Sequence, residues 1–127
     1  MAKAAPKNRF ETNAHEPAQQ RAIDLVHLAK QTLGDRNLEQ EVLRMFADGT
    51  RVYSRRITEA RTPEELKIGL HSLKGAAAGV GANGVAAVAR AAERELMETG
   101  ALSAEALSDV SFAVEEVNTY IEELLLD

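Results

Sequence analysis

The chain has 127 residues and carries 15 Lys and Arg against 20 Asp and Glu, which gives a net charge of −5 and predicts one domain with one core. Cysteine is absent, which excludes a disulfide framework and a cysteine-based zinc site or nucleophile, and the cytoplasm is the expected location. No apolar run approaches the roughly 20 residues of a membrane span, and the acidic balance argues against nucleic-acid binding.

Residues 1–20 are predicted to form a flexible N-terminal arm. They hold two of the three prolines and show no helical spacing of apolar residues. They also lack the apolar stretch of a secretory signal, so we do not expect export. A single helical domain is expected over residues 21–127.

Two helices are predicted after the arm. The first is short and ends at Gly34, and its apolar positions are Ile23, Val26, Ala29 and Leu33. The second begins after an N-cap at Asn37 and contains Gly49. Its apolar stripe is Leu38, Val42, Met45, Val52 and Ala60, widened by Phe46, Tyr53 and Ile57.

Three further helices follow at clear start and stop signals. Thr62, Pro63 and Glu65 predict a helix start with a capping box, and the buried stripe behind it is Leu66, Leu70, Leu73, Ala77 and Val80. Glycines from Gly79 to Gly84 end this helix, and the next runs from about Val85 to Thr99. Ser103 caps the last helix, whose apolar positions are Leu107, Val110, Val114, Val117, Ile121 and Leu124.

These elements predict an all-α fold, because no segment alternates apolar and polar residues as a half-buried strand does. Short connections between consecutive long helices make neighbours antiparallel. We therefore expect an antiparallel up-and-down four-helix bundle with an additional short N-terminal helix, present as a monomer.

His71 differs from the other two histidines in its surroundings. His15 lies in the polar arm and His27 at the edge of an apolar stripe, where a solvated or boundary histidine is the usual case. At about 100° per residue, Leu70 and Leu73 lie behind His71, so its imidazole points outward.

Small and basic residues surround His71 on the same face. Lys67 and Lys74 lie one turn before and after it, and Gly75 and Ala78 leave space beside it. A neutral imidazole nitrogen is a nucleophile, and ammonium groups can hold the oxygens of a phosphoryl group. The spacing alone is equally compatible with an exposed face carrying scattered lysines.

The segment from His71 to Ala82 reads HSLKGAAAGVGA. It resembles the H-x-L-K-G-x-[A/S]-x-x-[I/L/V]-G-A signature of histidine phosphotransfer (HPt) domains and meets every defined position. In helix layout the resemblance extends over residues 21–127, and it is close over residues 66–96.

The resemblance implies a phosphorelay carrier built as a four-helix bundle. By this likeness, His71 accepts a phosphoryl group from an aspartyl phosphate on one receiver domain and passes it to another receiver. Lys74 would steady the phosphoryl group, and Gly75 would give clearance to the receiver. The implied partners are response-regulator receiver domains and a hybrid histidine kinase. No cofactor is implied for this chain, because Mg²⁺ is expected on the receiver.

A second basic surface is predicted on the polar side of the second predicted helix, the one that begins after Asn37. Arg44, Arg51 and Arg55 recur there at steps of seven and four residues. They could steer an acidic receiver toward the bundle, although a solvated charged face explains them equally well.

Three other functions remain open at this point. The first is a helical adaptor that binds a receiver or kinase without phosphorylation of His71. The second is the N-terminal domain of a larger chemotaxis-type kinase, and the third is a purely structural bundle. The chain has no glycine-rich phosphate-binding loop, so we expect a phosphocarrier without ATP-dependent kinase activity of its own.

Overall fold

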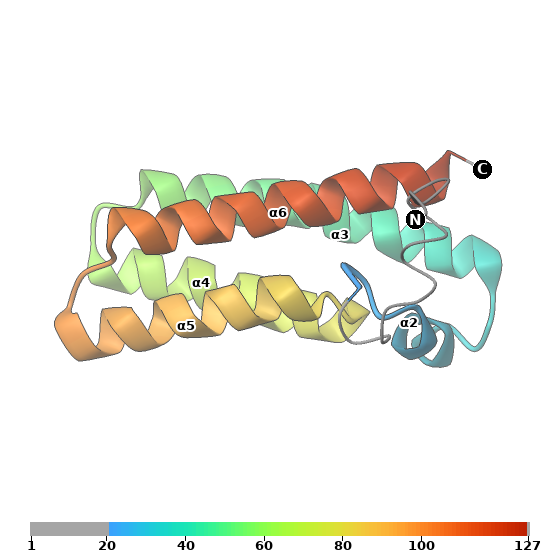
Figure 1. Ribbon diagram of the computed structural model, residues 1–127, viewed down its shortest axis with the longest axis horizontal. Coiled ribbons are helices and arrows are strands. Elements are labelled where there is room, and N and C mark those ends of the chain that lie inside the picture. Colours follow the sequence, from blue (N-terminus) through green and yellow to red (C-terminus); the bar gives the residue numbers. More distant parts are fainter. Residues whose placement is uncertain (1–20, 127) are drawn as a thin grey trace, which may run out of the picture.

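The computed structural model describes residues 21–126, so the predicted arm at residues 1–20 lies outside it. The described residues form helices only, and the helices are α2 (Leu25–Gln31), α3 (Arg36–Glu59), α4 (Pro63–Val80), α5 (Asn83–Thr99) and α6 (Ala104–Leu125) (Figure 1). None of these helices has the length and apolar character needed to cross a lipid bilayer.

The four long helices form a closed bundle. Each packs against the next along the chain, and α6 returns to pack against α3, so that α3 lies diagonally opposite α5 (Figure 1). The short α2 contacts α4 at one end of the bundle. The predicted all-α four-helix bundle with an additional N-terminal helix is therefore confirmed.

The helix ends follow from local hydrogen bonds. At the start of α4, Thr62 accepts a hydrogen bond from the Glu65 N–H at 3.1 Å, and the Glu65 carboxylate accepts one from the Arg61 N–H at 2.7 Å. Gly81 ends α4 with a φ of +82°, a conformation that favours glycine. The prediction of Asn37 as the cap of α3 was wrong, because the Asp35 side chain accepts the Leu38 N–H and starts the helix earlier.

The core lies between the four long helices. The predicted buried faces of α4 and α6 are confirmed at most positions, and the fully buried side chains there include Leu70, Leu73, Ala77, Val110, Val117 and Ile121. On α5 the buried positions are mostly small, namely Val85, Ala86, Ala89, Ala92 and Leu96. Small side chains let α4 and α5 approach closely.

The predicted core faces of the first two helices are confirmed only in part. Ile23, Phe46 and Ile57 are buried as predicted, but other predicted positions are exposed. Val26 on α2 and Leu33, which follows that helix, are 56% and 92% exposed, whereas Leu28 is buried. On α3 the predicted positions Leu38, Met45 and Val52 are exposed, and the buried residues are Leu43, Phe46, Ala47, Thr50 and Ile57.

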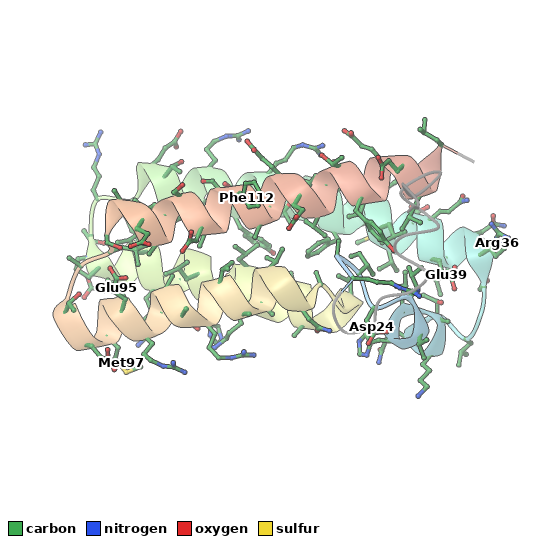
Figure 2. The ribbon with its side chains drawn as sticks, viewed as in Figure 1. Asp24, Arg36, Glu39, Glu95, Met97 and Phe112 are labelled. Carbon is green, nitrogen blue, oxygen red and sulfur yellow. The ribbon has the colours of Figure 1, made fainter. Side chains whose placement is uncertain are left out.

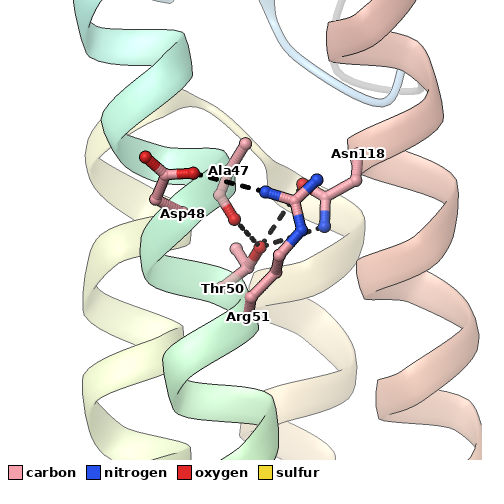
Figure 3. A network of polar contacts seen from close by, with 5 residues as sticks. All are labelled: Ala47, Asp48, Thr50, Arg51 and Asn118. Carbon is pink, nitrogen blue, oxygen red and sulfur yellow. Dashed lines mark hydrogen bonds and ion pairs between the residues drawn. The ribbon is translucent and has the colours of Figure 1, made fainter.

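Thr50 gives a physical reason why the buried face of α3 differs from the predicted one. Its hydroxyl is fully buried, donates to the Ala47 carbonyl at 2.8 Å and accepts from Nδ2 of Asn118 on α6 at 3.1 Å (Figure 3). A polar residue whose hydroxyl both donates and accepts a hydrogen bond can be buried in the core. A prediction based on the spacing of apolar residues omits Thr50.

The short helix α2 covers the end of α4. The Asp24 N–H donates to the Gly81 carbonyl at 2.8 Å, and Nε2 of His27 lies 3.1 Å from the Gly79 carbonyl. Ile23 and Leu28 are buried beneath this contact. The carbonyls at the C-terminal end of α4 thus find their partners on α2.

Candidate functional site

α4 presents His71 on its outer surface. The His71 side chain is 73% exposed, whereas Leu70 and Leu73 on either side of it are fully buried. The imidazole therefore points away from the core, in agreement with the helical spacing.

A carboxylate on the neighbouring helix lies between His71 and Lys74. Oε2 of Glu93 on α5 is 3.4 Å from Nδ1 of His71, and Oε1 of the same residue is 2.6 Å from Nζ of Lys74. Glu93 is only 15% exposed and Lys74 is 29% exposed, so both are held in the groove between the helices. Glu93 therefore contacts one imidazole nitrogen, Nδ1, and the other, Nε2, lies on the open side of the ring.

The position of Glu93 follows from the packing of α5. It comes directly after Ala92, which is buried in the stripe that faces the core. A glutamate at the edge of that stripe needs a partner on the adjoining helix, and Lys74 stands at the edge of the stripe on α4. Sequence reasoning did not single out Glu93, because no buried face was predicted for this helix. The available signal was an acidic residue directly after Ala92, at helical spacing from Ala89 and Leu96.

The other residues predicted around His71 are also on its open face. Lys67 lies one turn before His71 and is exposed. Gly75 and Ala78 are exposed, and a Cβ added to Gly75 would meet nothing within 4 Å. No neighbouring side chain within the described residues therefore requires a glycine at position 75.

The structure does not bring the predicted arginine stripe to this site. Arg51 pairs with Asp48 at 3.3 Å and lies beside Asn118 of α6 (Figure 3). Arg44 and Arg55 share its side of α3 by helical spacing. Since His71 contacts Glu93 on α5, the stripe lies on the α3/α6 side of the bundle and His71 on the α4/α5 side.

A groove of about 480 Å³ runs between α4 and α5. His71 is not in its lining but contacts one lining residue, Glu93. The lining includes Lys67, Lys74 and Glu93, together with Arg90, Arg94 and Met97, which sequence reasoning did not select. Residues from two helices form the groove, so the spacing of residues along one helix does not predict it.

Of the other two histidines, only His27 lies within the described residues, and it contacts the end of α4 rather than Glu93. His27 contacts Gly79 through Nε2, and His15 lies outside the described residues. Within residues 21–126, no group of three or more His, Asp or Glu side chains is arranged to hold a metal ion.

Comparison with known proteins gives one family. The family model of the Hpt domain matches residues 36–125, which span α3 to α6. Among curated proteins and among solved structures, no significant match was found.

Proposed function

Since the chain belongs to the Hpt domain family, we propose that it carries a phosphoryl group on His71 between receiver domains of a phosphorelay. Hpt domains are phosphocarrier modules of phosphorelay signalling, not kinases. The observation that carries the assignment to His71 is its exposed imidazole, held on one side by Glu93 and open on the other.

The geometry supports a simple transfer step. Glu93 faces Nδ1 of His71, which favours the proton on that nitrogen and leaves the lone pair on Nε2. Nε2 attacks the phosphorus of an aspartyl phosphate on the receiver, an N–P bond forms, and the P–O bond to the aspartate breaks. The aspartate leaves as a carboxylate with the electron pair, and the reverse step passes the phosphoryl group to the next receiver.

The neighbouring residues supply charge and space in this proposal. Lys74, fixed by Glu93, neutralises the phosphoryl oxygens, and Lys67 adds a second ammonium group from one turn away. Gly75 and Ala78 leave room for the receiver to bring its aspartate to the imidazole.

The partners are response-regulator receiver domains and a hybrid histidine kinase. Transfer to and from an aspartate needs Mg²⁺, which we assign to the receiver, and phosphate from ATP reaches His71 only through a kinase. The cytoplasmic location and the monomeric state stay predictions.

Phosphate labelling tests the proposal. The purified protein is incubated with a panel of phosphorylated receiver domains, and acid-labile, alkali-stable phosphate is measured in the parent, in His71→Gln and in the control His27→Gln. We expect label in the parent and the control and none in His71→Gln. Full labelling of His71→Gln, or label mapped to His27, would overturn the assignment. Binding to a receiver without any labelling would favour the adaptor.

A further inference from the structure

The groove between α4 and α5 carries positive charge that the protein itself does not neutralise. Lys67, Arg90 and Arg94 line it, all three are exposed, and none of them forms an ion pair within residues 21–126. Of the two acids in the lining, Glu93 is already shared between His71 and Lys74, and only Glu64 remains. Unpaired cations in a groove attract an anionic surface.

The groove also has an apolar end. Met97 of α5, labelled in Figure 2, is 82% exposed, and it lies in the lining together with Pro63, the first residue of α4. An exposed methionine is a flexible apolar contact that adapts to a partner surface. From Pro63 to Lys74 the groove follows α4 for about 16 Å.

The positive charge near His71 is concentrated in the α4/α5 groove. α6 contains no lysine or arginine, and its acids are Glu105, Asp109, Glu115, Glu116, Glu122 and Glu123. The arginine stripe lies on the α3/α6 side of the bundle, whereas His71 contacts α5 through Glu93. A partner in contact with His71 therefore meets its cations in the α4/α5 groove.

We propose that this groove receives an acidic surface of the receiver domain that exchanges phosphate with His71. The inference rests on the proposed function and specifies the side from which the receiver approaches. A receiver that holds Mg²⁺ beside its aspartate does so with carboxylates, so its reactive face is acidic. Arg90 and Arg94 attract that face, and Met97 contacts its apolar margin.

Charge reversal tests the groove. The test variant is R90E/R94E, and the matched control is K30E/R36E, which changes the charge equally at the far end of the bundle (Figure 2 labels Arg36). A third variant, R44E/R55E, tests the rival surface on α3. The second-order rate of transfer is measured with the receiver that reacts fastest with the parent, at low and at high salt.

We expect R90E/R94E to slow transfer by about tenfold or more at low salt and to flatten the salt dependence. K30E/R36E should react at the parent rate. Parent-rate transfer by R90E/R94E, or a slowing found only in R44E/R55E, would overturn the inference.

Labelling with phosphoramidate separates this inference from the proposed function. This small phosphodonor needs no docking, so His71 should be labelled equally in all variants. If the parent accepts no phosphate from phosphoramidate or from receivers, the proposed function itself fails. Dimerisation of the parent in sedimentation, abolished by R90E/R94E, would assign the groove to a second copy of the chain and overturn the receiver as its occupant.

Discussion

At the scale of single residues, Glu93 fixes the geometry around His71. One carboxylate contacts the imidazole through one oxygen and the Lys74 ammonium through the other. Because Glu93 is largely buried, these contacts are shielded from water more than those of a surface ion pair. We therefore regard Glu93 as a residue that positions the imidazole.

We expect Glu93→Gln to slow phosphoryl transfer by on the order of tenfold, because a misplaced reacting group loses its alignment. The amide oxygen can still face Nδ1, but the charge that holds Lys74 is lost. The measurement pairs the transfer rate with the tautomer of His71 determined by NMR of the ring nitrogens. Glu98→Gln, at an exposed position of the same helix, is the control. A parent rate together with an unchanged tautomer would show that Glu93 has no positioning role.

Gly75 gives the second prediction at this scale. A leucine there enters open space, so Gly75→Leu should raise the stability of the fold by up to about 1 kcal/mol through helix propensity. It should nevertheless slow transfer, because the side chain occupies the receiver's approach to His71. Thermal unfolding and the transfer rate are measured together, with Ala87→Leu at an exposed position of α5 as the control. Unimpaired transfer in Gly75→Leu would place the receiver elsewhere.

At the scale of helices, α3 and α4 are in close contact where Gly69 faces Ile57. A Cβ added to Gly69 would lie 2.8 Å from Cγ1 of Ile57, and Ile57 is itself buried. The branched side chain has little room to move, so the absence of a side chain at position 69 allows Ile57 to pack against the backbone of α4.

We expect overpacking in Gly69→Ala to destabilise the protein by about 1–3 kcal/mol. The higher helix propensity of alanine offsets up to about 1 kcal/mol of this loss. Gly75→Ala adds the same methyl group to the same helix in open space and should be neutral or stabilising. Urea unfolding of both variants measures the difference. Equal stability of the two variants would mean that Ile57 yields without cost.

Except for the start of α3 at Asp35, the helix ends with local signals could be predicted from the sequence. The contacts between helices could not. Thr62, Pro63 and Gly81 act on their own helix, so their spacing in the sequence is enough. The core face of α3 includes Thr50, whose hydrogen-bond partner Asn118 lies 68 residues away in the sequence. Glu93 was missed for the same reason, since its partners His71 and Lys74 lie on another helix.

At the scale of the whole molecule, α2 is held to the bundle by a few polar contacts and two buried side chains. The Asp24 amide and the His27 ring both bond carbonyls at the end of α4. Ile23 and Leu28 belong to the same hydrophobic core as the long helices. The helix that carries His71 therefore depends on a segment about 50 residues earlier in the chain.

We expect His27→Ala to lower the unfolding free energy by about 1 kcal/mol, the usual net value of one hydrogen bond, which corresponds to a fall of about 3–5 °C in Tm. Amide exchange in the last turn of α4 should quicken as well. Lys30→Ala, at an exposed position of α2, should change neither quantity. An unchanged Tm and exchange rate in His27→Ala would mean that the contact with Gly79 contributes nothing to stability.

The burial of Ile23 and Leu28 affects how this unit can be moved between proteins. The family match begins at Arg36, after both residues. A fusion or excised fragment built from residues 36–125 would lose α2, uncover the apolar surface beneath it and leave the last carbonyls of α4 to water. The smallest fragment that keeps these contacts therefore starts before Ile23. A fragment with the bounds of the family match would lack them.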